Sequence, residues 1–347
     1  TNNLGTRYLR RLVLAGESGG WLVGDGGLAL TTKDGGFTWG TPAAPLPEAV
    51  RDFDFRAVAV LGNHCWIAGN PGSSIFHSHD GGQTWQTYRT EQSLPIRALT
   101  FFDENRGWAV GSLGTILATR DGGRTWRQQH SGGTRAAMLG IFSEPSRVPL
   151  EVFAQQSGKE SYLGAVEIIS RFDEGATSRE ASLSERTHEA LLSVGGSQAD
   201  TAWRFPLRPA EIVRSSQAIL NSWNEANDGK SVELLEEHLV RRIRTWRPDV
   251  ILTEDLSPRG ENPLAHLTNQ IVLRATEKAA DATAYSDQLT LSGLAAWRVK
   301  KVFAVQDGDK QGTVNITPSQ WAPRTGRSLA ESAEQGHSML AKDVLPA

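Results

Sequence analysis

Few side chains in this sequence have a spacing that suggests catalysis or ligand binding. The clearest candidate is an acidic pair. Glu254 and Asp255 are the last residues of the stretch 247–255, which we expect to be a strand leaving a helix end, so the pair lies at the carboxyl end of that strand. In α/β sheets the crevice outside the carboxyl ends of the strands is the usual ligand site. Together with Arg259 the two carboxylates could contact a ligand, although a solvated loop explains the same residues.

The sequence gives little evidence for disulfides, zinc sites, phosphate loops or a nucleophilic serine. The single cysteine, Cys65, excludes an intramolecular disulfide and a cysteine-based structural zinc site. His188 and His238 stand alone within helical patterns, which is typical of exposed or hydrogen-bonded helix histidines. The stretches 24–27 and 195–197 are too short for phosphate loops, and no serine lies in a nucleophile-elbow pattern. We therefore assign no catalytic residue.

Composition narrows the functional class further. The 347 residues favour two domains, and 36 Lys+Arg against 39 Asp+Glu give a formal net charge of −3. This balance argues against a nucleic-acid binder with a strongly basic surface, and no apolar run reaches the roughly 18 residues of a membrane helix. Because the chain opens Thr-Asn-Asn-Leu without Met, we expect a processed chain or a fragment. We favour an extracytoplasmic location, periplasmic or secreted.

The elements that must position these residues begin with a tryptophan repeat. Trp21, Trp66 and Trp108 each start a Trp-x-x-Gly signature, which recurs after 45 and then 42 residues. Each is followed by an Asp-Gly-Gly-x-Thr-Trp signature, so six of the 11 tryptophans occupy repeat positions. A period of this length is that of a four-stranded propeller blade. The second signature is carried by Asp34, Trp39, Asp80, Trp85, Asp121 and Trp126.

The second signature has the chemistry of a tight turn. Each aspartate can accept hydrogen bonds from N–H groups of its own turn, and the glycines that follow supply positive φ angles. The tryptophan at the end of the signature is expected to pack on the neighbouring blade. We predict strands over 28–32, 74–78 and 115–119 before the turns, and over 55–61 and 96–102 at the openings of blades two and three.

This repeat resembles the Asp-box (BNR) repeat of photosystem II stability/assembly factors and their non-photosynthetic bacterial relatives, over residues 8–130 or so. The resemblance implies a β-propeller in which the Asp boxes are structural. Sialidases share the repeat, but no arginine cluster with a tyrosine nucleophile can be assigned here. Because three blades do not close a ring, we expect further blades outside this sequence, or packing on the neighbouring domain or on another copy.

The second half of the chain has a different pattern. We divide it into residues 1–134, the Asp-box blades, and residues 135–347, where helical patterns alternate with apolar strands. Such alternation favours a mostly parallel, layered α/β sheet. The predicted strands are 136–142, 164–170, 247–255 and 299–305, and the predicted helices are 149–156, 177–192, 232–246 and 264–275.

This succession resembles the PIG-L/LmbE-like family of zinc-dependent N-acetylglucosaminyl deacetylases, which implies a Rossmann-like domain. The matching stretches are 179–195, 203–207, 247–253 and 324–331. The family's Ala-His-Pro-Asp-Asp-Glu motif is replaced by Ser-Glu-Pro-Ser-Arg-Val over 143–148, which puts Glu144 in place of the ligand histidine and Arg147 in place of an aspartate. Of the family's second motif only His266 remains as a substitute ligand.

These replacements decide the functional prediction. Catalytic zinc needs about three protein ligands, whereas Glu144 and His266 give at most two, and Arg147 opposes a cation. We therefore predict a non-catalytic binding or assembly module without metal or cofactor, in which partial propeller blades precede a degenerate PIG-L-like domain and a protein or glycan is bound. The residues predicted to bind are Glu144, Arg147, Glu254, Asp255, Arg259 and His266.

Two alternatives remain open. The first is an active zinc-dependent deacetylase with an atypical metal site around Glu144, Glu254, Asp255 and His266. The second is that the α/β domain is an insertion between blades, with the rest of the propeller encoded after residue 347.

Overall fold

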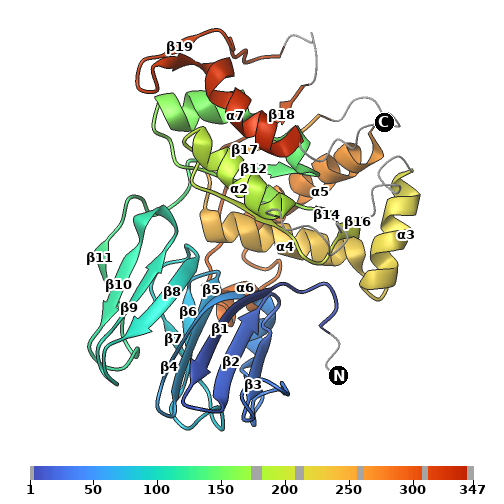
Figure 1. The fold of residues 1–347 in the computed structure, drawn as a ribbon. Coiled ribbons are helices and arrows are strands. Elements are labelled where there is room, and N and C mark those ends of the chain that lie inside the picture. Colours follow the sequence, from blue (N-terminus) through green and yellow to red (C-terminus); the bar gives the residue numbers. More distant parts are fainter. Residues whose placement is uncertain (1–3, 173–181, 208–214, 256–261, 307–311, 342–347) are drawn as a thin grey trace. The chain divides into compact units, whose positions relative to one another are not determined.

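The computed structural model describes residues 4–172, 182–207, 215–255, 262–306 and 312–341. The chain forms two compact units. The first contains residues 1–135 together with 241–246 and 281–297, and the second contains the remaining residues. The first unit therefore includes two segments that lie far beyond residue 134 in the sequence. Figure 1 shows the elements of both units.

Three antiparallel sheets form the bulk of the first unit (Figure 1). The first sheet has three strands and the other two have four each, with neighbouring strands joined in chain order. The strands predicted before the turns and at the repeat openings are confirmed to within a residue or two at their ends. The sheets are built from β1 Leu9–Ala15, β2 Gly19–Gly24 and β3 Ala29–Thr32; β4 Asp54–Leu61, β5 His64–Asn70, β6 Ser74–Ser78 and β7 Gln86–Arg89; and β8 Ile96–Phe101, β9 Gly107–Gly111, β10 Ile116–Thr119 and β11 Arg127–His130.

The two distant segments of the first unit bind one end of these sheets. The segment 281–297 contains the short helix α6, Asp287–Thr290. The Ser292 hydroxyl donates to the Asp52 carboxylate at 2.7 Å, and the Ser73 hydroxyl donates to the Ser292 carbonyl. The Ser93 hydroxyl donates to the Thr245 carbonyl at 2.8 Å. Asp52, Ser73 and Ser93 lie just before β4, β6 and β8. The Asp-box turns follow β3, β6 and β10, so the two distant segments and the turns lie at opposite ends of the strands.

Arg244 holds the segment 281–297 in shape from within the first unit. Its side chain is fully buried, and it donates to the carbonyl oxygens of Asp281, Ala284 and Tyr285 at 2.8, 2.9 and 3.1 Å. The same guanidinium donates to the Gln288 side-chain oxygen at 3.2 Å. Four acceptors of one irregular segment therefore depend on a single cation.

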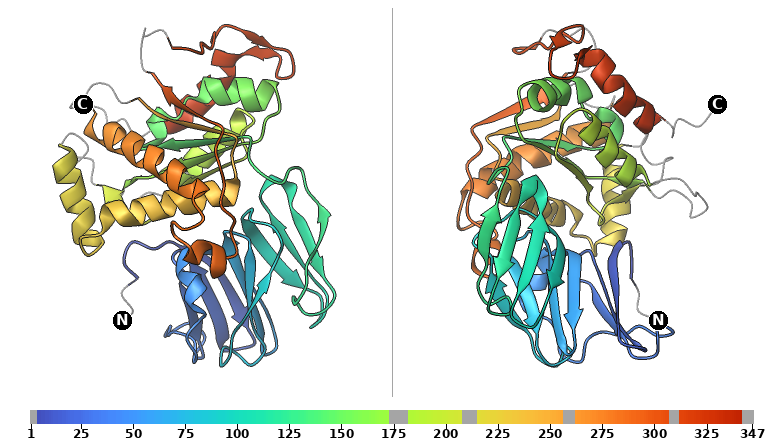
Figure 2. Two further views of the ribbon diagram at one scale, coloured as in Figure 1. Left: turned by 180° about the vertical axis from the view of Figure 1, so that it is seen from behind. Right: turned by 60° about the vertical axis from the view of Figure 1, so that its left-hand side comes forward.

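A five-stranded parallel sheet is the centre of the second unit (Figure 2). Its strand order is β15-β13-β12-β17-β18, so the chain winds outward in both directions from β12. All five residues of β12 and of β13 are buried, as expected of a parallel sheet covered on both faces. The strands are β12 Met138–Phe142, β13 Gly164–Ile168, β15 Gln198–Thr201, β17 Val250–Glu254 and β18 Lys301–Val305.

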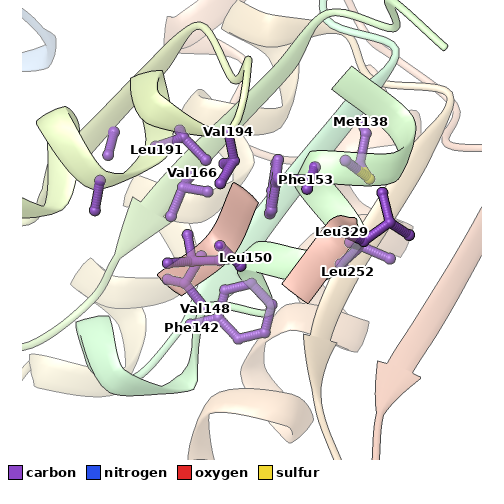
Figure 3. Packing of buried hydrophobic residues seen from close by; sticks show 14 of the residues in the cluster. Met138, Phe142, Val148, Leu150, Phe153, Val166, Leu191, Val194, Leu252 and Leu329 are labelled. Carbon is purple, nitrogen blue, oxygen red and sulfur yellow. The ribbon is translucent and has the colours of Figure 1, made fainter. Parts of the chain in front are cut away.

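Helices cover this sheet and supply the rest of the core. Side chains from α1, α2 and α7 pack on alternate strand residues, among them Met138, Val166 and Leu252 (Figure 3). The intervening residues, such as Leu139 and Ile251, are equally buried and point away from that cluster. The helices are α1 Leu150–Phe153, α2 Leu183–Ser193, α3 Ser216–Ala226, α4 Ser231–Trp246, α5 Pro263–Ala280 and α7 Leu329–Ala341.

Several shorter elements complete the described chain. A π-helix, Ala154–Lys159, continues directly from α1, so the helical stretch runs three residues past the predicted range 149–156. The mixed architecture, with several antiparallel sheets beside an α/β unit, agrees with the fold class expected from the sequence. The remaining pieces are the two-stranded pairs β14 Arg171–Phe172 with β16 Pro206–Leu207 and β19 Trp321–Ala322 with β20 Arg327–Ser328, and the 3-10 turns Glu48–Asp52, Ser112–Gly114 and Pro145–Arg147.

Candidate functional site

The Asp-box carboxylates are satisfied by their own turns. Asp80 accepts from the Thr84 N–H at 2.8 Å, from the Thr84 hydroxyl at 2.6 Å and from the Ser78 hydroxyl at 2.8 Å. The hydroxyl of Ser78 in turn accepts from the Gly82 N–H at 2.7 Å. The same arrangement recurs around Asp34, with Thr32 and Thr38, and around Asp121, with Thr119 and Thr125.

These hydrogen bonds stabilise the ionised carboxylates. The Thr38 hydroxyl, followed by the Thr38 N–H and the Thr32 hydroxyl, lowers the pKa of Asp34 to about 2. The Thr84 hydroxyl is the largest cause of a still lower pKa at Asp80. Burial raises the pKa of Asp121, but hydrogen bonds from Thr125 and Thr119 outweigh it and leave that pKa below its usual value. The geometry is that of a locked turn.

The repeat tryptophans link one sheet to the next. Trp66 of β5 is fully buried, and its indole N–H donates to the Gly122 carbonyl of the third Asp box at 2.8 Å. Its ring stacks on Phe101 of the third sheet, with 3.6 Å between ring centroids. Trp21 of the first sheet meets Trp85 of the second Asp box edge to face at 5.7 Å. The indole N–H groups of Trp39 and Trp126 donate instead to glycine carbonyls of their own turns.

A second polar cluster lies where the strands of the parallel sheet end. Glu254 is the last residue of β17, and one of its carboxylate oxygens accepts from the Ser143 N–H, just after β12, at 2.5 Å. The Ser170 N–H, just after β13, donates to the Ser143 carbonyl at 3.2 Å. The Asn269 amide on α5 donates to the Glu254 carbonyl. Loops after β12, β13 and β17 therefore meet here, at the point where the strand order reverses.

Burial sets the electrostatics of this strand-end cluster. Glu254 is 4% exposed, and desolvation raises the pKa of its carboxyl group, with Glu144 adding to the rise. Hydrogen bonds from Ser143 and the charge of Arg147 act in the opposite direction. Arg147 also forms an ion pair with Glu144, with 3.5 Å between its Nε and the carboxylate. Glu254 therefore stays protonated, and so uncharged, to a higher pH than an exposed glutamate.

Five buried polar atoms of the strand-end cluster have no hydrogen-bond partner among the described residues. Buried polar groups are normally satisfied by protein, water or a bound species. A set of such atoms at the carboxyl ends of parallel strands therefore gives this cluster unused hydrogen-bonding capacity. They are the Ser143, Ser170 and Thr253 hydroxyls, the second carboxylate oxygen of Glu254 and the side-chain oxygen of Asn269.

The structure brings together some, but not all, of the residues predicted to bind. Glu144, Arg147 and Glu254 lie within electrostatic reach of one another. Asp255 follows directly after β17 and is half-buried, and Arg259 lies outside the described residues. His266 hydrogen-bonds to Gln270, one turn further along α5, at 3.1 Å. No group of three or more His, Cys, Asp or Glu able to hold a metal ion occurs within the described residues.

Sequence reasoning missed the neutral members of the cluster. Ser143 and Ser170 each follow an apolar strand directly, which is a signal that could have been used. Asn269 lies on the buried face of α5, where a polar residue among apolar ones is a weaker signal. His238 is a hydrogen-bonded helix histidine, one of the two outcomes expected for it, and it pairs with the buried Glu167 at 2.7 Å.

The sequence of the first unit is similar to that of known proteins. The family model of the photosynthesis system II assembly factor YCF48 matches residues 9–98. The photosystem II assembly lipoprotein Ycf48 of Synechococcus sp. (strain CC9902) is 33% identical over 113 residues, which cover 31% of this chain and 33% of the relative. The chain thus spans about a third of the length of this relative. The predicted resemblance of the Asp-box region to photosystem II assembly factors is confirmed.

Solved structures are similar to part of the chain. A structure of YCF48 bound to D1 peptide is 29% identical, covers 38% of this chain and 44% of its own, and gives a TM-score of 0.34. The N,N'-diacetylchitobiose deacetylase from Pyrococcus horikoshii is 13% identical, covers 59% of this chain and 71% of its own, and gives a TM-score of 0.39. The PIG-L-like assignment of the second unit stays a prediction. No helix within the described residues is both long and apolar enough to cross a membrane.

Proposed function

We propose that this protein is a non-catalytic binding or assembly module. In this proposal the three sheets of the first unit are Asp-box propeller blades, and the second unit is a PIG-L-like domain without zinc chemistry. The observation that carries it is the commitment of all three Asp-box carboxylates to hydrogen bonds within their own turns. Such turns form a rigid support for exposed loops and leave none of these three carboxylates free for acid-base work.

The end of the blades that carries the Asp boxes is the proposed contact surface for a protein partner. The opposite strand ends are already bound by residues 241–246 and 281–297. The Asp-box turns expose the variable residue of each motif, namely Phe37, Gln83 and Arg124. Relatives of this region are named as photosystem II assembly proteins, which supports a protein over a glycan as the partner class. Two of them are named as lipoproteins, which supports an extracytoplasmic location.

The residues at the strand-end cluster do not fit a catalytic zinc ion. Glu144 is paired with the cation Arg147, and one oxygen of Glu254 already accepts from the Ser143 N–H. His266 is engaged with Gln270 on its own helix. Catalytic zinc normally has about three protein ligands and one open position. Unpaired hydroxyl and carboxyl oxygens instead support binding of a small polar group here.

An activity assay tests the non-catalytic assignment. The purified chain, supplied with zinc, is incubated with N-acetylglucosamine derivatives, and released acetate is measured. We expect no zinc-dependent release. Release that depends on zinc and disappears in a Glu254→Gln variant would overturn the proposal in favour of a deacetylase.

Metal analysis separates the two assignments independently. We expect less than stoichiometric zinc in the purified chain and no change in a His266→Ala variant. A matched control is His130→Ala, which removes an exposed histidine of the first unit. One zinc per chain that is lost in His266→Ala and retained in His130→Ala would support the atypical metal site instead.

A further inference from the structure

In the first unit, the same kind of contact joins the first sheet to the second and the second to the third. The third sheet has the corresponding residues, but no sheet among the described residues of the unit covers them. Trp21 and Val23 on β2, and Trp66 and Ala68 on β5, are buried against the following sheet. The corresponding residues of β9, Trp108 and Val110, are 38% and 43% exposed. We call this exposed pair the leading face.

The receiving side of the contact shows the same regularity. Trp21 lies against Gly82 and Trp66 against Gly123, so a Cβ atom at these glycines would fall 2.8 and 3.2 Å from the indole rings. At Gly36, the equivalent glycine of the first Asp box, a Cβ atom would meet, among the described residues, only the ring of Trp39 from the same turn, at 3.7 Å. The place that a preceding tryptophan fills in the other two boxes is open.

Strand residues beside this open place are also uncovered. Leu12 pairs with Leu22 across β1 and β2, as Val58 pairs with Ile67 and Leu99 with Ala109 in the other sheets. Val58 is 3% exposed and packs in the core between sheets, whereas Leu12 and its same-face neighbour Leu14 are 48% and 64% exposed. We call Leu12, Leu14 and Gly36 the receiving face.

Every copy of the chain thus carries both halves of an inter-sheet contact, one at each end of its array of sheets. We propose that two copies associate head to tail, with the leading face of each packed on the receiving face of the other. Trp108 would lie over Gly36 of the second copy as Trp66 lies over Gly123 within the chain. The occupant is a second copy because it presents the required glycine turn and apolar strand, and because the new contact continues one already made twice.

The number of sheets supports closure at two copies. Contacts between unlike surfaces close into a ring when the rotations add up, and otherwise grow into open filaments. Two copies supply six sheets, within the range of about four to eight blades found in propellers. A third copy would exceed that range. The proposal relies on the blade assignment made above but not on the absence of catalysis, so the acetate assay and the association assay fail independently.

Sedimentation or light scattering of the full chain over a wide concentration range tests the association. We expect a species of twice the chain mass. Trp108→Glu on the leading face and Leu14→Glu on the receiving face should each raise its dissociation constant by roughly tenfold or more. Val110→Glu and Leu12→Glu repeat the test at neighbouring positions, and near-ultraviolet circular dichroism verifies that each variant is folded.

The control is Phe37→Gln, which removes the most exposed aromatic side chain of the unit. Its equivalents Gln83 and Arg124 are exposed although their Asp boxes are covered, so position 37 lies outside both faces. A chain that stays monomeric at every concentration overturns the proposal. A dimer that Phe37→Gln weakens as much as Trp108→Glu also overturns it. So does a dimer that is weakened by substitutions on only one of the two faces, since that result means that like surfaces pair.

Discussion

The Asp-box turns of the first unit and the strand-end cluster of the second differ in how their polar groups are satisfied. In the first unit the Asp-box carboxylates find all their donors within a few residues, and the same contacts recur from sheet to sheet. In the second unit Glu254, Ser143 and Ser170 come together from separate strands and leave buried oxygens without a partner among the described residues. The difference teaches where substitutions should damage stability and where they should be tolerated. Substitutions that remove scaffold contacts should lower the free energy of unfolding. Substitutions in the strand-end cluster should have little effect on stability when no ligand is bound.

The largest effect is expected inside the first unit, at Trp66. Trp66→Ala removes a fully buried ring, its stacking on Phe101 and its hydrogen bond to Gly122, which should lower the free energy of unfolding by about 3–5 kcal/mol. Trp108→Ala is the matched control at an uncovered repeat position, with an expected loss below about 1 kcal/mol in dilute protein. Urea unfolding followed by tryptophan fluorescence measures both. Equal losses would mean that the repeat contacts do not stabilise the unit.

A smaller loss is expected at Arg244, where one side chain satisfies four acceptors. Arg244→Ala leaves the carbonyls of Asp281, Ala284 and Tyr285 without this donor, and should cost about 2–3 kcal/mol. Hydrogen exchange at residues 281–297 should rise markedly while exchange in β12 stays the same. Arg244→Lys, which keeps the charge but not the fork of donors, is expected to fall between wild type and alanine. Unchanged exchange in 281–297 would contradict the role given to Arg244.

The Asp-box turns predict an acid-sensitive first unit. Because hydrogen bonds lower the pKa of Asp34 to about 2, the folded state binds fewer protons than the unfolded state between this value and the ordinary pKa near 4. The contribution of Asp34 is therefore complete above pH 4 and is lost as the pH falls towards 2. Asp34→Asn should flatten that part of the stability curve, measured by thermal unfolding at a series of pH values. Glu17→Gln in an exposed turn is the control, and a similar flattening there would refute the assignment.

The smallest effect, and one of opposite sign, is expected at Glu254. Burial raises the pKa of this carboxyl group, so its ionisation on going to higher pH weakens the folded state. Glu254→Gln keeps an oxygen to accept from the Ser143 N–H and removes the charge. The free energy of unfolding should rise by up to about 1 kcal/mol at pH 8 and stay the same at pH 4. A loss at both pH values would mean that the carboxylate is structural, and would erase the contrast between the two units.

Local spacing in the sequence predicts most of the first unit and only part of the second. The Asp boxes and their strands depend on residues within about ten positions of each other, as in the prediction of β6 over 74–78. Glu254 was placed correctly at a strand end because an apolar run precedes it. Asn269 joins it through a contact between distant elements, which no local pattern encodes. Residues 281–297 join the first unit for the same reason, since Ser73 and Ser292 are 219 positions apart.

This discontinuity affects how the protein is made. On the ribosome, the sheets of the first unit emerge well before residues 281–297, which supply a hydrogen bond to Asp52 and receive one from Ser73. At about 5–20 residues per second, synthesis of the intervening stretch takes on the order of 10–30 s. During that interval the nascent sheets hold an unfinished end, so a chaperone has a defined window in which to protect them. A fragment that stops at residue 135 remains permanently in that unfinished state.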